Sequence, residues 1–173
     1  MTDLALDSVR RFARYNRWAN RRLYDACATL SPEAYHAARP SFFGSIHATL
    51  NHILVGDSIW LGRFKGAVPA HLTRLNMILH EDFVSLRAAR EAKDAEILAF
   101  VEGLDSAALA GSFTYKNMRG EQFTDPLYPP LTHFFNHQTH HRGQAHTVLC
   151  ILGRRDLELD LLYFQREVAA GRA

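Results

Sequence analysis

Histidine is the residue type whose number and spacing in this chain point most directly to chemistry. Five of the 10 histidines fall within one segment of fourteen residues. They are His133, His137, His140, His141 and His146. In a helix, His133, His137 and His141 lie on one stripe because they are four residues apart. Val148 and Leu152 continue this stripe, and their apolar side chains indicate that it faces the core.

Stacked histidines on an inward-facing stripe predict a metal site rather than a purely structural cluster. Each buried neutral imidazole needs both a hydrogen-bond donor and an acceptor, which a helix interface rarely supplies several times over. Two imidazoles four residues apart on one helix can instead bind a single ion, as the histidines of the HExxH motif do. The residues between His137 and His141 are Gln138-Thr139-His140, so the glutamate of that motif is absent and a metalloprotease is excluded.

The third ligand is less clear from the pattern, although a site with two histidines usually needs another protein ligand. A second long helix, predicted over residues 42–65, offers His47 and His52. The two histidines are five residues apart and therefore project from different faces of that helix. His47 lies on the side of Leu50 and His52 on the side of Val55, so both have apolar neighbours. Periodicity leaves the choice between them open.

The elements that must position these histidines are helices. Helical periodicity of apolar residues marks four long segments, residues 4–30, 42–65, 81–102 and 125–152. Residues 113–124 alternate between apolar and polar types around a central turn, which predicts a small β-hairpin. Short helices are expected from Pro32 and over residues 157–169. We therefore predict an all-α protein, a four-helix bundle with one crossover loop, a hairpin before the fourth long helix and a short C-terminal helix.

The composition is that of one globular domain covering residues 1–173. Hydrophobic residues make up 47% and charged residues 22%, which excludes disorder as the default. A net charge of +2 gives no reason to expect nucleic acid or a membrane surface as a partner. Neither a signal peptide nor a membrane span is recognisable, so a cytoplasmic location is expected. Cys27 and Cys150 stand among apolar neighbours and are interpreted as reduced, buried thiols.

Two motifs stand out, Asn51–Leu61, NHILVGDSIWL, and Asn136–Gln144, NHQTHHRGQ, together with YNRWAN near the start and DLLYF near the end. These segments resemble the DinB/YfiT family of metal-binding bundles. The resemblance covers nearly the whole chain. It implies that the metal ligands are His52, His137 and His141. His47, His133 and His140 would then be neighbouring or merely packed residues, with His133 as the replacement ligand if the register is different.

Three neutral imidazoles leave a divalent ion with an open position, as in catalytic zinc sites. Zinc or nickel is the expected ion, with manganese and iron as alternatives. Proteins that this chain resembles include transferases and isomerases that use low-molecular-weight thiols such as bacillithiol and mycothiol. The leading hypothesis is therefore a metal-dependent thiol-S-transferase or detoxification enzyme that joins such a thiol to an electrophilic small molecule.

Two other functions stay open at this stage. A metal-dependent hydrolase would use metal-bound hydroxide, and Asp57 and Gln144 are within reach of the site by helix register, although no general base is identified. Alternatively, the metal would only clamp the second helix to the fourth in a stress-related protein without catalytic activity. The resemblance further implies a homodimer.

Overall fold

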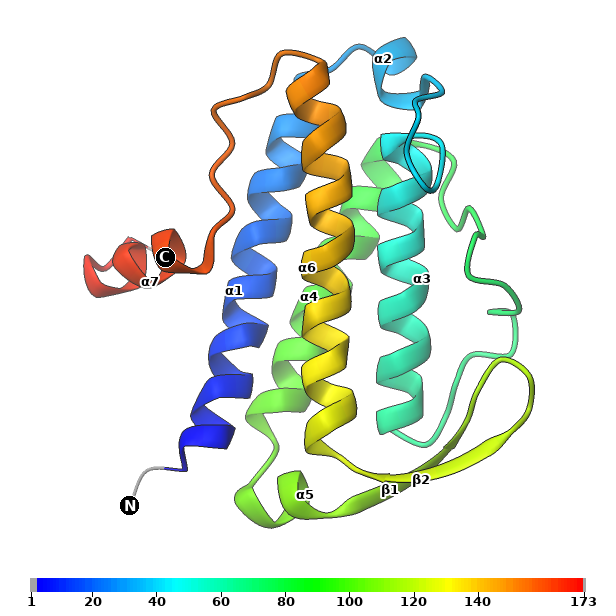
Figure 1. Ribbon diagram of the computed structural model, residues 1–173, viewed down its shortest axis with the longest axis vertical. Coiled ribbons are helices and arrows are strands. Elements are labelled where there is room, and N and C mark those ends of the chain that lie inside the picture. Colours follow the sequence, from blue (N-terminus) through cyan, green and yellow to red (C-terminus); the bar gives the residue numbers. More distant parts are fainter. Residues whose placement is uncertain (1–2, 173) are drawn as a thin grey trace.

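The computed structural model describes residues 3–172 and shows a bundle of four long helices (Figure 1). These are α1 (Leu4–Cys27), α3 (Ile46–Phe64), α4 (Phe83–Glu102) and α6 (Tyr128–Ile151). Helix α1 packs against α4 and α6, and α3 packs against the same two helices. Helices α1 and α3 are therefore diagonal to each other, and the interface between α3 and α6 brings together the two histidine-bearing segments. The predicted all-α bundle is confirmed.

The direction of the helices explains the long connection in the middle of the chain. Helices α1 and α6 run one way along the bundle, and α3 and α4 run the other way (Figure 1). Because α3 and α4 are consecutive and parallel, residues 65–82 must return along the length of the bundle. Leu72 of this connection packs against Val55 and Ile59 of α3. The connection is the predicted crossover loop, and it covers one side of α3.

The shorter elements lie at the ends and on one side of the bundle. They are α2 (Pro32–His36), α5 (Ser106–Ala110), β1 (Ser112–Lys116), β2 (Gln122–Pro126) and α7 (Leu161–Ala169). The strands are antiparallel, as predicted, and Thr114 pairs with Thr124. Between them, Asn117 Oδ1 accepts hydrogen bonds from the backbone N–H groups of Arg119 and Glu121. The hairpin crosses the end of the bundle, and its turn rises beside α3 (Figure 1).

Some boundaries differ from those that the sequence predicts. Helix α3 begins at Ile46 rather than at residue 42, because Gly44 adopts a φ of 80° and Ser45 caps the helix by accepting a hydrogen bond from the N–H of Ala48. The C-terminal helix begins at Leu161 rather than at residue 157. The single turn of helix α5 was not predicted, and its N-cap is Asp105. None of these differences moves the predicted metal ligands off their helices.

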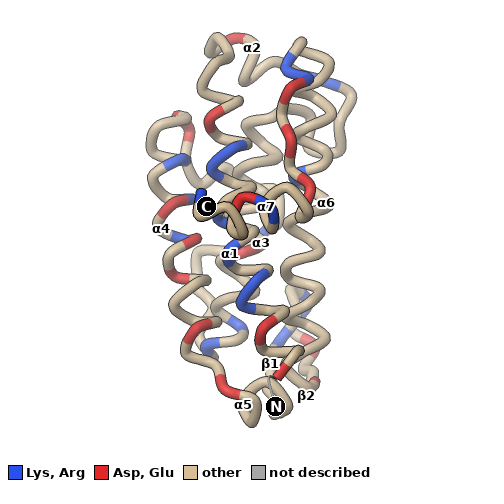
Figure 2. Tube along the Cα trace, turned by 90° about the vertical axis from the view of Figure 1, so that its left-hand side faces the viewer, with Lys and Arg blue, Asp and Glu red and all other residues tan. Residues whose placement is uncertain are grey.

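The core is layered along the bundle axis. One apolar layer contains Val9, Leu61, Val101 and Leu131, and a second contains Leu23, Leu50, Leu86 and Leu149. On the outside, acidic and basic residues are interspersed along the helices, as Figure 2 shows for one face. Within residues 3–172, no helix combines the length and the hydropathy that crossing a membrane requires.

A polar layer separates the two apolar layers. It consists of seven side chains, here called the buried polar network: Asn16, Asn20, Asp57, Arg90, Asp94, Gln138 and Arg142. Arg90 lies 2.5 Å from Asp57 and 2.9 Å from Asp94. Gln138 donates a hydrogen bond to the second oxygen of Asp57. All four long helices contribute to the network, and its two arginines balance its two aspartates.

Candidate metal centre

The structure brings together the three histidines that were predicted as metal ligands. His137 and His141 project from α6, and His52 projects toward them from α3. The Nε2 atom of His141 lies 3.2 Å from Nε2 of His52 and 3.1 Å from Nε2 of His137. One nitrogen from each ring lies within 4.8 Å of the others, which is close enough for one ion to contact all three. We call these residues the histidine cluster.

Hydrogen bonds on the far side of two rings determine which nitrogens face the centre as acceptors. Nδ1 of His52 lies 2.8 Å from the carbonyl oxygen of Leu75, and Nδ1 of His141 lies 2.8 Å from Oε1 of Gln144. Both partners are acceptors, so both Nδ1 atoms carry the hydrogen. The Nε2 atoms of His52 and His141 are therefore unprotonated, and their lone pairs point toward each other. Such an arrangement could hold a cation between the rings, and the donor set fits a divalent metal ion.

The protonation states suit the same role. Burial, followed by the charges of the neighbouring imidazoles His141 and His52, lowers the pKa of His137 to about 3. Burial also lowers the pKa values of His52 and His141. All three rings are thus neutral at pH 7, which is the form that binds metals. Two nitrogens bound to a tetrahedral ion at about 2.0–2.1 Å are about 3.3–3.4 Å apart, close to the spacing between these rings.

Packing holds the rings of the cluster in place. Phe43 stacks on His52 with ring centroids 3.9 Å apart and meets His141 edge-on at 5.4 Å. Gly56 of α3 lies directly against His137, and a Cβ atom at Gly56 would be 3.0 Å from Cε1 of that ring. A side chain there would push the ring out of position. Helix α3 therefore provides one ligand, His52. Its residue Gly56 and the preceding Phe43 support the rings of His137 and His141.

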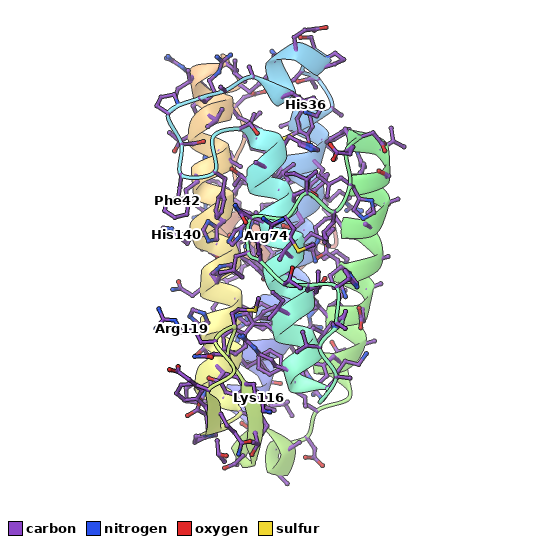
Figure 3. All side chains as sticks on the ribbon, turned by 90° about the vertical axis from the view of Figure 1, so that its right-hand side faces the viewer. His36, Phe42, Arg74, Lys116, Arg119 and His140 are labelled. Atoms are coloured by element: carbon purple, nitrogen blue, oxygen red, sulfur yellow. The ribbon has the colours of Figure 1, made fainter. Side chains whose placement is uncertain are left out.

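The remaining histidines lie outside the cluster. His47 is bonded to the hydroxyl of Tyr35 at 3.3 Å and faces the other end of α3. The ring of His133 is 5.9 Å from that of His137 and packs against Trp60, so it borders the cluster without joining it. His140 is exposed on α6, where Figure 3 labels it, and its Nε2 lies 3.2 Å from the side-chain amide of Gln144.

The two residues considered as hydrolytic bases have other roles. The carboxylate of Asp57 belongs to the buried polar network, where Arg90 and Gln138 bind both of its oxygens. Gln144 orients His141 by accepting its Nδ1 hydrogen. The thiols also lie apart from the cluster. Cys27 and Cys150 are both free, and burial raises the pKa of Cys27 to about 12.

A cavity of about 380 Å³ opens beside the histidine cluster. It is lined by Gly56, Ile59, Trp60, Arg63, Leu75, Asn117, Met118, Arg119, His133 and His137. Within the described part of the chain, this lining contains two arginines and no carboxylate. Sequence reasoning missed Arg63, Leu75 and Arg119, because they reach the site only through the end of α3, the crossover loop and the hairpin. Figure 3 shows Arg74 of the loop, the neighbour of Leu75, in front of α3 at the level of His140.

Comparison with known proteins agrees with this arrangement. A model described as "DinB family" matches residues 1–170, a range that includes all three histidines of the cluster. The chain is also 26% identical over 149 residues to Protein DinB of Bacillus subtilis (strain 168). That alignment covers 78% of this chain and 80% of the relative. The helical bundle, its hairpin and the extent of the family match lead to one conclusion: the chain belongs to the DinB family.

Proposed function

We propose that the histidine cluster binds one divalent metal ion and that the protein is a metal-dependent transferase for low-molecular-weight thiols. The observation that carries the proposal is that neutral imidazole nitrogens converge beside a cavity. The lone pairs of His52 and His141 point toward the centre of the cluster. Zinc or nickel is the proposed ion, with manganese and iron as alternatives. When bound, such an ion would supply a position that keeps a thiol as its thiolate.

The chain's own residues would orient the reactants. Leu75 and Gln144 fix the rings of His52 and His141 by accepting their outer hydrogens. The apolar side chains of Ile59 and Trp60 line the cavity beside the cluster, along which the reactants would lie. In the reaction, a bond forms between the sulfur and an electrophilic carbon, the leaving group departs with its electron pair, and the thiol proton passes to solvent.

The cavity lining favours this reaction over hydrolysis. A metal-dependent hydrolase usually needs a general base near the attacking water. Among residues 3–172, the cavity beside the cluster has no Asp or Glu in its lining, and Asp57 is bound within the buried polar network. A thiol with a lowered pKa needs no such base. The cavity itself favours an enzyme over a protein in which the metal only joins α3 to α6.

Metal content of paired variants is the first test. Untagged protein purified without chelator should contain about one divalent ion per chain by elemental analysis. His141→Ala should lose that ion, whereas His140→Ala should keep it, because His140 lies next to the cluster without belonging to it. Retention of the ion by His141→Ala, or its absence from the reconstituted wild-type protein, would refute the metal site.

Turnover separates the three functions. Metal-loaded protein is mixed with chlorodinitrobenzene and a low-molecular-weight thiol, and release of chloride is followed. Activity that needs both metal and thiol supports the transferase. Hydrolysis of test esters without thiol would support the hydrolase. Loss of thermal stability on chelation, with no turnover of any substrate class, would support a structural metal. The homodimer and the cytoplasmic location stay predictions, and light scattering in solution tests the first.

A further inference from the structure

Arg63 is a nearly buried cation with no anionic partner. Only 9% of the residue is exposed, and within residues 3–172 no carboxylate lies within ion-pairing distance of it. Its Nε donates to the carbonyl oxygen of Lys116 at 3.2 Å, and its guanidinium lies over the rings of Trp60 and Tyr115. A charge placed in this way is costly unless an anion joins it.

Arg63 lies at the boundary between two cavities that share lining residues. Arg63 lines the cavity beside His137 and also a second cavity of about 360 Å³ beneath the hairpin. The two cavities share Ile59, Asn117 and Met118, so we treat them together as the hairpin groove. Its charged lining residues are Arg63, Lys116 and Arg119. Among residues 3–172, no acidic residue lines either cavity, so the groove presents one sign of charge.

His137 and Arg63 give two parts of the hairpin groove different chemistry. His137 of the histidine cluster lines the cavity at one end, and Arg63, which lines both cavities, lies where they meet. Gly56, which touches His137, is seven residues before Arg63 on α3, so the helix rises about 10 Å between the level of His137 and the level of Arg63. Ile59 of α3 lies between these two levels, and Met118 lines both cavities. Figure 3 shows Arg119 on the hairpin between Lys116 and the level of His140.

We propose that the hairpin groove binds a carboxylate of the thiol substrate, with Arg63 as the residue that recognises it. This inference rests on the proposed function, because it places the sulfur at the histidine cluster. The planar guanidinium has its terminal nitrogens free of hydrogen bonds to residues 3–172, and it suits a carboxylate in two-point contact. The substrate is thus a thiol whose carboxylate is separated from its sulfur by a neutral part, with a length similar to the helix rise of about 10 Å from Gly56 to Arg63.

The test compares matched thiols on the metal-loaded protein by calorimetry. Mercaptooctanoate reaches from the cluster to Arg63, mercaptooctanol has the same length without the charge, and mercaptopropionate is too short. The wild-type protein should bind mercaptooctanoate about tenfold to a hundredfold more tightly than mercaptooctanol, the ratio expected for a charge-assisted hydrogen bond. Mercaptopropionate should show no such advantage over mercaptopropanol.

Variants locate the source of that preference. Arg63→Gln should abolish it, so that mercaptooctanoate binds no more tightly than mercaptooctanol, and circular dichroism checks that the variant is folded. Lys65→Gln is the matched control, because Lys65 follows α3, pairs with Glu96 and lines neither cavity. Arg119→Gln changes only the exposed hairpin turn and should reduce the preference in part, so a second result is available if Arg63→Gln does not fold.

Two outcomes separate this inference from the proposed function. Equal preference for mercaptooctanoate in the wild-type protein and Arg63→Gln would overturn the role of Arg63 while leaving thiol binding in place. If no thiol binds the metal-loaded protein, the proposed function fails, and octanoate is titrated alone. Binding of octanoate that Arg63→Gln abolishes would still support an anion site in the hairpin groove. Absence of that binding would refute the site.

Discussion

Replacement of Asp57 by Asn should destabilise the protein far more than removal of an exposed charge. Asp57 is fully buried, and Arg90, at 2.5 Å, is only 2% exposed. The buried polar network contains two aspartates and two arginines, so Asp57→Asn leaves an uncompensated positive charge between two apolar layers. Removing one partner of a buried pair typically costs about 3–5 kcal/mol. For a domain of this length, this corresponds to a fall in Tm of roughly 6–20 °C.

The matched control is Glu96→Gln on the same helix as Arg90. Glu96 pairs with Lys65 at 2.9 Å and with Lys93 at 2.5 Å, and its own side chain is more than a third exposed. Water and salt screen such pairs, so their loss should cost about 1 kcal/mol or less. The assay is urea unfolding followed by circular dichroism at pH 7, with chelator present so that metal binding adds nothing. If Asp57→Asn and Glu96→Gln cost the same, the argument that burial controls the energy of the pair is wrong.

Two further predictions concern the histidine cluster. Gly56→Ala should weaken metal binding about tenfold or more, because the added Cβ would lie 3.0 Å from the ring of His137. Gly143→Ala should not weaken it, because the space around Gly143 is open. Competition with a chromophoric chelator measures the metal affinity of both variants. The metal-free protein should lose stability as the pH falls below about 6.5, with a slope approaching about 1.4 kcal/mol per pH unit. The reason is that His137 takes up a proton in the unfolded chain but stays neutral in the folded protein, where its pKa is lowered. Urea unfolding at several pH values tests this, and a slope unchanged in His137→Gln would contradict the assignment to that residue.

The fold could be predicted from the sequence because its main signals are local. Helical periodicity, the Ser31-Pro32 cap and the alternation around residue 117 each depend on a few neighbouring residues. The spacing of His137 and His141 is also local, since one helix carries both. The choice between His47 and His52 is different. Both are buried, at 6% and 3% exposure, because α3 is covered on nearly all sides, so burial pattern alone could not separate them. The resemblance to a known family did.

The rest of the site depends on packing between distant segments. Asp57 resembled a candidate base on helix register, but Arg90 and Gln138 hold it inside the buried polar network, and those partners come from α4 and α6. The local sequence around Arg63, near the end of a helix, contains no signal of a function. Its position over Trp60 and below the hairpin becomes apparent only when residues 112–126 are placed against α3. Polar residues at core-facing positions on all four helices were the signal that could have revealed the network.

The separation of His52 and His141 along the chain has a consequence for folding. The two residues are 89 positions apart, yet their Nε2 atoms are 3.2 Å apart in the folded bundle. An ion held by both would act as a reversible cross-link that closes this long loop. Chain-entropy arguments give such a closure about 4–5 kcal/mol, comparable with a disulfide across a loop of the same length. A chain without disulfides could thus gain or lose a stabilisation comparable with that of a disulfide, depending on how much metal is available to it.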